Sequence, residues 1–189
     1  MPKIIGLSGT IGSGKEIVKE YFMKKYNCYH VSLSSVIRAE FEKRKGIFNR
    51  KVWQDQGNEM RKKYGNFILA KLAISYMSKD KQIIIVDGLR NPGEVEYLKR
   101  EFGRSFYLIG VDAPQKVRFE RIMKRNRPSD PKTWEEFVAI DERDQGINEP
   151  PYGQQTKACL DLADFIVVTD ISANQLEGKL NEISNEIMG

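Results

Sequence analysis

Cysteine and histidine are scarce in this sequence. Its 189 residues include two cysteines, Cys28 and Cys159, and a single histidine, His30. Two cysteines are too few for a disulfide framework, and the pair is not spaced as a metal site. We therefore expect both cysteines to be buried thiols.

Long hydrophobic runs are also missing. No apolar run approaches the roughly 20 residues that cross a bilayer, and residues 1–6 lack the long apolar stretch of a signal peptide. We expect a cytoplasmic protein with no membrane partner. Hydrophobic residues make up 40% and charged residues 30% of the chain. This composition excludes disorder, and the length favours one compact domain over residues 1–189.

The net charge of +5 is not concentrated in one basic tract. Acidic and basic residues alternate through much of the chain, as in residues 40–45, a pattern typical of a solvated helix face. Nucleic-acid binding is a minor alternative, because the sequence has no aromatic and basic module of the kind that binds RNA or single strands. The phosphates of a small substrate would explain the surplus equally well.

Apolar runs rich in strand-forming residues alternate with amphipathic stretches. The runs predict five buried parallel strands, at residues 3–8, 28–32, 82–87, 105–112 and 164–169. The stretches between them predict helices at residues 15–25, 33–43, 51–79, 92–101, 114–125, 133–145 and 175–188. This alternation predicts an α/β sandwich with right-handed crossovers. Turn residues at 126–131 and at Pro150 and Pro151 bracket one helix, which indicates either a lid or a surface helix.

The clearest motif is a glycine-rich loop between the first strand and the first helix. It consists of Gly9, Thr10, Ile11, Gly12, Ser13, Gly14 and Lys15. Glycines let successive backbone amides turn toward an anion, the helix N-terminus faces it, and Lys15 can reach the β- and γ-phosphates. The strand–loop–helix context predicts a phosphate-binding loop for ATP.

The residue after this lysine departs from the usual pattern. Serine or threonine normally holds magnesium there through its hydroxyl, and this sequence has Glu16. A carboxylate is also a ligand for hard cations, but near a triphosphate it repels unless a metal intervenes. Glu16 is therefore either a ligand in a variant Mg²⁺ site or a side chain that turns away while water fills the position.

These residues resemble the nucleoside monophosphate kinase-like group of P-loop proteins, including deoxynucleoside monophosphate kinases, adenylate kinase-related proteins and dephospho-CoA kinases. The resemblance spans nearly the whole chain. It implies a P-loop NTPase three-layer sandwich with a five-stranded parallel sheet of order 2-3-1-4-5. It also implies a helical acceptor-binding region at about residues 33–79 and a lid at about 126–151. Residues 30–40 are similar to the segment that begins the acceptor site, where Arg38 would bind the acceptor's phosphate through its planar fork.

The third predicted strand ends in a carboxylate followed by an arginine. An apolar run delivers Asp87 to the carboxyl edge of the sheet, where α/β proteins bind ligands. In similar kinases an aspartate here organises magnesium and its waters or contacts the acceptor, and the position of Arg90 often touches acceptor phosphate. A capping role for Asp87 is the structural alternative.

Four arginines lead into the segment resembling a lid, and the first three share one helix face: Arg118, Arg121, Arg125 and Arg127. In similar kinases such arginines close over ATP and neutralise the transferring phosphoryl group. We select Arg121, Arg125 and Arg127 for this role beside Lys15.

Other candidates carry weaker signals. Arg143 is either a further lid arginine or part of an ordinary surface run, and its acidic neighbours at 141, 142 and 144 are interpreted as surface residues. Residues 152–154 are candidates for lining the acceptor pocket, and the resemblance assigns residues 170–173 a backbone contact with adenine. His30 is expected to pack or cap rather than catalyse.

The sequence favours a kinase that transfers phosphate from ATP directly, in line, to a nucleoside or deoxynucleoside monophosphate. Dephospho-CoA kinase is an alternative, because its acceptor carries anionic groups similar to those of a nucleoside monophosphate. A non-catalytic nucleotide-binding regulatory module is an alternative of another class, because Glu16 would impair magnesium chemistry. The arginines favour the enzyme, since pure nucleotide binding needs the glycine loop alone. Neither the acceptor nor the oligomeric state follows from the sequence.

Overall fold

A computed structural model describes residues 2–41, 50–78 and 80–189. At its centre lies a five-stranded sheet of order β2-β3-β1-β4-β5 in which all neighbours are parallel. The strands are β1 Lys3–Ser8, β2 Cys28–Ser32, β3 Ile83–Leu89, β4 Phe106–Asp112 and β5 Phe165–Val168. The predicted fold class and strand order are thereby confirmed, with β3 extending two residues beyond the predicted end at Asp87.

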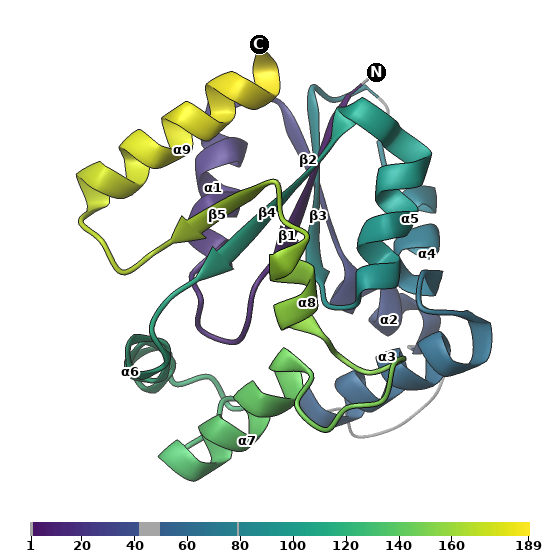
Figure 1. Ribbon diagram of the computed structural model, residues 1–189, viewed down its shortest axis with the longest axis vertical. Helices are drawn as coiled ribbons and strands as arrows, with labels where there is room; N and C mark the ends of the chain where they lie inside the picture. Colours follow the sequence, from purple (N-terminus) through teal and green to yellow (C-terminus); the bar gives the residue numbers. More distant parts are fainter. Residues whose placement is uncertain (1, 42–49, 79) are drawn as a thin grey trace.

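Helices cover both faces of the sheet (Figure 1). α1 Lys15–Lys25 and α9 Ala173–Met188 lie on one face, and α2 Leu33–Phe41, α4 Ile68–Ser75, α5 Pro92–Phe102 and α8 Thr156–Asp161 lie on the other. The remaining helices, α3 Arg50–Tyr64, α6 Gln115–Arg125 and α7 Trp134–Gln145, lie beyond the carboxyl ends of the strands. One turn of 3₁₀ helix, Gly103–Ser105, leads into β4.

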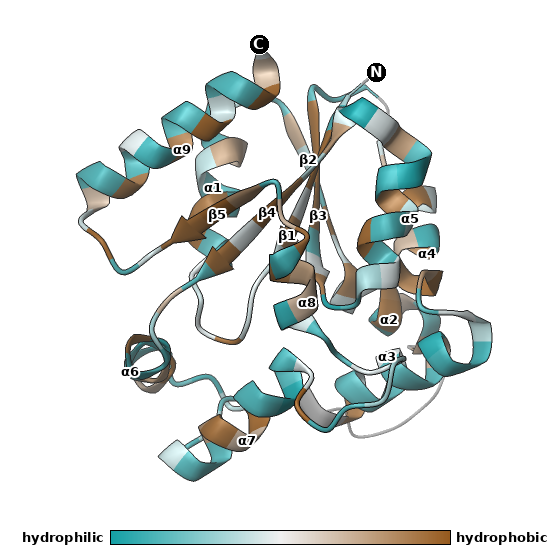
Figure 2. Cartoon of the chain, in the orientation of Figure 1, coloured by the Kyte–Doolittle hydropathy of each residue, from teal (hydrophilic) through white to brown (hydrophobic). Residues whose placement is uncertain are grey.

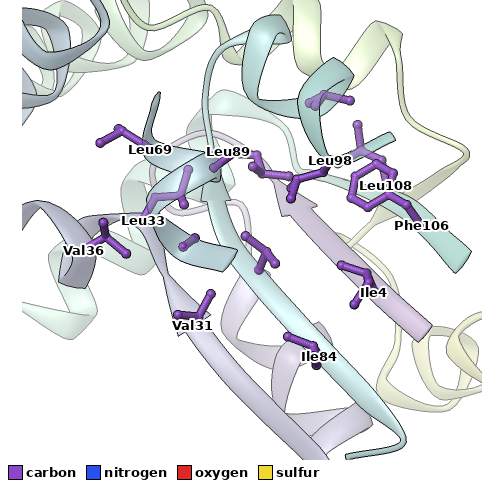
Figure 3. Packing of buried hydrophobic residues seen from close by; sticks show 14 of the residues in the cluster. Ile4, Val31, Leu33, Val36, Leu69, Ile84, Leu89, Leu98, Phe106 and Leu108 are labelled. Atoms are coloured by element: carbon purple, nitrogen blue, oxygen red, sulfur yellow. The ribbon is translucent and has the colours of Figure 1, made fainter. Parts of the chain in front are cut away.

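The core consists of two apolar layers, one on each face of the sheet. In β3, Ile84 and Val86 pack into one layer, and Ile83 and Ile85 pack into the other. Figure 2 shows the strands as a hydrophobic centre and the outer sides of the helices as hydrophilic. Figure 3 shows side chains of the larger layer, including Ile84 of β3 and Leu98 of α5, between the sheet and the helices that cover it. Burial on both faces explains why the strands are continuous apolar runs rather than alternating ones.

The structure differs from the sequence predictions in two helices and in the burial of one cysteine. The helix predicted at 51–79 is two helices, α3 and α4, because Gly65 adopts φ 97° and turns the chain between them. Helix α8 was not predicted, because six residues are too few to show a helical period. Cys28 is half-buried rather than buried, whereas Cys159 is buried as expected. Residues 42, 43 and 79, at the ends of two predicted helices, lie outside the described residues.

No helix in the described parts of the chain has the length and apolar character to cross a bilayer.

Parallel strands bring the ends of β1, β3 and β4 to a single edge, and the neighbours of β1 on its two sides come from different parts of the chain. Such a switch point is where open α/β sheets form their ligand crevice.

Candidate active site

The glycine-rich loop leaves β1 and enters α1 without a side-chain cap. Gly12 and Gly14 have φ 78° and 93°, values that disfavour side chains, and a Cβ atom on Gly12 would lie 2.7 Å from the carbonyl oxygen of Arg118. The α1 N-terminus is therefore open to an anion. Lys15 Nζ donates to the carbonyl oxygens of Gly9 and Thr10, at 2.5 and 3.2 Å, so its ammonium folds back over the loop.

Glu16 lies outside the loop's concave side. Its side chain is 62% exposed, forms an ion pair with Lys19, and does not line the cavity that Lys15 lines. In this structure the Glu16 side chain therefore turns away from the cavity, and its role toward magnesium stays a prediction.

Asp87 lies near the end of β3 beside the glycine-rich loop. Its Oδ1 is buried without a hydrogen-bond partner, and its Oδ2 is 3.9 Å from Nε2 of His30, which is also buried and unpartnered. Burial lowers the pKa of His30, and the neighbouring Asp87 carboxylate opposes that shift only in part. Asp87 thus presents an oxygen that no described side chain satisfies.

A cavity of about 440 Å³ opens between the loop, α2, α3 and the α6–α7 connection. Six of the predicted site residues line it: Lys15, Arg38, Asp87, Arg90, Arg125 and Arg127. Of the candidate pocket residues at 152–154, only Gln154 lines it. Segments far apart in the sequence therefore supply a phosphate loop, a carboxylate and several cations to one space.

The arginines of α6 have different surroundings. Arg125 is bound by both carboxylate oxygens of Asp130, at 2.8 and 2.5 Å, and still lines the cavity. Although burial raises the pKa of Asp130, the Arg125 side chain and the Arg127 amide hold it below its usual value. Arg121 does not line the cavity, because its guanidinium donates to the hydroxyl and carbonyl oxygens of Thr169, at 2.7 and 2.8 Å.

Arg118, the first of the four, is buried rather than directed at a ligand. Its guanidinium donates to both carboxylate oxygens of Asp141 and to the carbonyl oxygens of Ala113 and Ile11. Asp141 and Asp144 are fully buried, so the prediction that these acids are surface residues was wrong. Their partners, Arg118 and Arg90, lie far away in the sequence, where an inspection of α7 alone could not find them.

Side chains of α7 and the loop after it bind α3. Arg143 donates to Asp55 at 2.7 Å and to Glu149 at 3.1 Å, and Glu149 also accepts from Asn58 at 3.0 Å. The predicted lid segment is thus attached to the predicted acceptor region, and Arg143 is occupied by these acids instead of lining the cavity.

Arg90 connects the end of β3 to the same network. Its Nη1 donates to Asp144 at 2.8 Å and to Gln154 at 2.6 Å, while the backbone N–H of Arg90 donates to Glu94 at 2.8 Å. With both N–H groups of Nη1 occupied, its Nε and Nη2 edge has no described partner. That edge has the geometry for bidentate binding of an anion.

One face of α3 contributes to the cavity without having been predicted. Trp53, Gly57 and Arg61 line the cavity, and their spacing of four residues places them on one side of the helix. Arg61 is only 3% exposed. The spacing was visible in the sequence, but a helix predicted as one long stretch offered no reason to select this face.

Comparison with known proteins identifies the family. Residues 5–144 match the family model described as an AAA domain. UPF0200 protein MJ1399 of Methanocaldococcus jannaschii is 34% identical, over 97% of this chain and 92% of its own length. UPF0200 protein PH1008 of Pyrococcus horikoshii is 31% identical, over 98% of this chain and 97% of its own. The chain belongs to the UPF0200 family.

Solved structures with the same fold include kinases. TT1252 from Thermus thermophilus has a TM-score of 0.61 at 18% identity, covering 100% of this chain and 99% of its own. Shikimate kinase from Aquifex aeolicus has a TM-score of 0.54 at 18% identity, covering 98% and 96% of the two chains. These likenesses show that the UPF0200 chain has a P-loop kinase-like fold.

Proposed function

We propose that this UPF0200 protein is an ATP-dependent phosphotransferase that phosphorylates a nucleoside or deoxynucleoside monophosphate. The observation that carries the proposal is the lining of one cavity by Lys15 of the glycine-rich loop together with Arg38, Arg90, Arg125 and Arg127. A loop that binds ATP alone needs the glycines and the lysine. The additional cations suit a second phosphate-bearing molecule, whose charge must be compensated beside that of ATP.

On the donor side of the reaction, cationic side chains and backbone amides would stabilise the negative charge of the ATP phosphates. The amides of residues 9–14 would hold the phosphates of ATP, and Lys15 would leave the Gly9 and Thr10 carbonyls to contact the β- and γ-phosphates. We assign Arg125 and Arg127, at the start of the lid, to the transferring phosphoryl group. Arg121 would act more indirectly, because it connects Gly12 of the loop to Thr169, the residue after β5.

On the acceptor side of the reaction, arginine side chains would orient the phosphate of the acceptor. Arg38 and the unoccupied edge of Arg90 would hold the acceptor's phosphate so that one of its oxygens faces the γ-phosphorus in line. The acceptor oxygen is then itself the nucleophile, and no side chain is phosphorylated. A phosphate acceptor fits these cations better than an uncharged hydroxyl acceptor does.

The residues present fit a magnesium ion that is bound largely through ATP. The buried, unpartnered Oδ1 of Asp87 suits a hydrated cation, whereas the exposed Glu16 does not reach the cavity. Among the residues that the structure describes, no cluster of three or more His, Cys, Asp or Glu side chains is able to hold a metal. Asp87 would hold the ion, which supplies charge neutralisation on the phosphates when bound.

The proposal is tested by coupled ADP release with ATP and Mg²⁺. The panel contains ribonucleoside and deoxynucleoside monophosphates, dephospho-CoA and shikimate. We expect turnover with nucleoside monophosphates and none with shikimate, which carries no phosphate. Turnover with dephospho-CoA alone would reassign the acceptor. Tight ATP binding without any acceptor-dependent turnover would favour a regulatory nucleotide-binding module.

Arg38→Ala should raise the acceptor's KM by roughly tenfold to a hundredfold, as expected for loss of a hydrogen bond between charged groups, with little change in the KM of ATP. Arg38 is exposed at the cavity and lies 5.6 Å from the ring centroid of Trp53, so the fold should not depend on it. Arg104→Ala, at an exposed arginine outside the cavity, is the control. An equal rise in both KM values would contradict the assignment.

Glu16→Thr should strengthen magnesium-dependent ATP binding by roughly tenfold, because it removes a carboxylate from the first turn of α1, whose N-terminus would face the triphosphate, and supplies a hydroxyl there. Isothermal titration with and without Mg²⁺ measures this, and Glu20→Thr on the exposed side of α1 is the matched control. Collapse of binding in Glu16→Thr would identify Glu16 as a ligand and reject the arrangement described above.

A further inference from the structure

The cavity changes character from its entrance to its floor. Three exposed arginines line its entrance: Arg38, Arg125 and Arg127. Arg61, in contrast, is only 3% exposed. Leu33 and Leu69 line the same space and are buried in the core layer of Figure 3. The phosphate of an acceptor therefore suits the entrance, and its remaining part suits the apolar floor.

Arg61 is held rigidly at this floor. Its Nε and Nη2 lie 2.8 and 2.7 Å from Oε1 of Glu94, which is fully buried, and its Nη1 donates to Asn58 Oδ1 at 3.2 Å. One N–H on Nη1 and one on Nη2 remain without a described partner. An arginine side chain has donors and no acceptor, so whatever meets these groups must accept a hydrogen bond.

Glu94 determines which charge the part of the acceptor that contacts Arg61 can carry. Because Arg61 and Glu94 form a buried pair of opposite charges, the floor carries no net charge from them. A carboxylate or second phosphate would face a guanidinium that is already paired with Glu94, so its own desolvation would be poorly compensated. A neutral acceptor such as a keto oxygen fits these remaining donors better.

Gly57 leaves Arg61 accessible from the cavity. It lies inside α3, where glycine is less favourable than alanine by about 1 kcal/mol. A Cβ atom there would lie 3.6 Å from Nη1 of Arg61 and 3.2 Å from Cδ1 of Ile37. These neighbours line the cavity, so a methyl group at this position would cover the guanidinium.

Trp53 supplies the remaining feature of the site. Its indole lines the cavity one helical turn before Gly57, beside the apolar side chains of Leu33 and Leu69. Flat apolar and aromatic walls that end in a hydrogen-bond donor match a heterocyclic base with a keto edge. A sugar, which carries hydroxyls around its ring, matches them less well.

We infer that Arg61, exposed to the cavity through Gly57, is a specificity-determining residue that selects nucleoside monophosphates whose base presents a keto oxygen. This inference rests on the proposed function, and it names the substrate class for that site. Bases with an amino group in the corresponding place would put donor against donor and leave the Arg61 N–H groups unsatisfied.

Two pairs of nucleotides isolate this preference. Inosine and adenosine 5′-monophosphate differ at the keto or amino position of a purine, as uridine and cytidine 5′-monophosphate do for a pyrimidine. We expect the keto member of at least one pair to have the smaller Kd, by roughly tenfold, by isothermal titration to the wild-type chain, because its hydrogen bond is to a charged donor. Equal affinities in both pairs, or preference for the amino members, would overturn the inference.

Gly57→Ala tests access to Arg61 without breaking the ion pair. The variant should fold, since alanine favours the helix and the terminal methyl group of Ile37 needs to shift by only a few tenths of an ångström, but it should weaken binding of the keto member and reduce the keto-to-amino ratio toward one. Gly178→Ala in α9 is the matched control, because a Cβ there meets no heavy atom within 4 Å. A uniform loss for all four nucleotides in Gly57→Ala would indicate a change of pocket size and reject a role for Arg61.

A paired variant tests the guanidinium itself. Arg61→Gln combined with Glu94→Gln removes both charges together, keeps the floor polar, and retains a side chain that can cap α5. The keto preference should disappear in this variant, and its persistence would contradict the inference.

The outcomes separate this inference from the proposed function. A keto preference in binding, without ADP release from any acceptor, would reject the kinase and retain the inference about Arg61. Turnover with the amino members preferred would retain the kinase and reject the inference. Absence of binding by all four nucleotides would reject the inference, and the dephospho-CoA arm of the ADP-release panel would then decide whether the chain is a kinase.

Discussion

Replacing Lys15 by alanine is expected to reduce phosphoryl transfer by roughly 10²- to 10³-fold, the scale measured when one preorganised transition-state donor is removed. Lys15 contacts the carbonyls of Gly9 and Thr10 and lines the cavity. In the proposed function its charge would lie close to the bond that breaks at the γ-phosphorus. Because negative charge on the transferring group increases in the transition state, kcat should decrease much more than ATP affinity.

The measurement is steady-state ADP release together with an ATP titration and a thermal melt. Lys24→Ala, at an exposed lysine of the same helix, controls for loss of charge on α1. Lys15→Met, which keeps the apolar stem, separates loss of the ammonium from loss of packing. Turnover at the wild-type rate in a folded Lys15→Ala variant would reject the proposed mechanism.

Replacing Asp141 by alanine is expected to lower the free energy of unfolding by about 3–5 kcal/mol, because it leaves the buried guanidinium of Arg118 without its counterion. Asp141 is fully buried and Arg118 is 4% exposed. The same carboxylate accepts from Gln115 at 3.0 Å and from Gln145 at 2.8 Å, and these amides would also lose a partner. Alanine is a better helix former than aspartate, so intrinsic helix propensity would oppose the loss.

Urea unfolding monitored by circular dichroism measures this change. Glu142→Ala removes a carboxylate from an exposed neighbouring position of α7 and should change stability by less than about 0.5 kcal/mol, as is usual for surface substitutions. Asp141→Asn, which keeps the volume, provides a second variant if the alanine variant is too unstable to purify. A loss in Asp141→Ala no larger than that in Glu142→Ala would mean that Arg118 finds another partner.

The parts of this fold that were predictable have their determinants close together in the sequence. The β1–loop–α1 unit could be predicted because glycines and an apolar run adjoin each other, and α1 begins and ends where expected, at Lys15 and Lys25. Helix α7 was bounded correctly to within one residue, since Thr133 caps its start and Gly146 ends it at φ 97°. The sheet order, in contrast, came from the resemblance to a family.

The parts that were not predictable depend on partners distant in sequence. Asp144 has the composition of a surface residue in a charged run, and its burial becomes intelligible only beside Arg90, 54 residues away. The floor of the cavity likewise depends on Arg61 meeting Glu94, 33 residues away. Local periodicity contains no information about such pairs, so the candidate site could be predicted at its loop and its entrance arginines but not at its floor.

Under the inference that Arg61 selects the base, Glu94 limits how substrate preference can diverge among relatives of this chain. One of its oxygens binds Arg61, and the other accepts from the backbone N–H groups of Arg90 and Asn91, which immediately precede α5. A substitution at Glu94 alone therefore disturbs a helix start as well as the pocket, and selection should remove most such variants before a new preference arises. Gly57 has no side chain that supports another element, so divergence should pass through this position of α3 while Glu94 stays fixed.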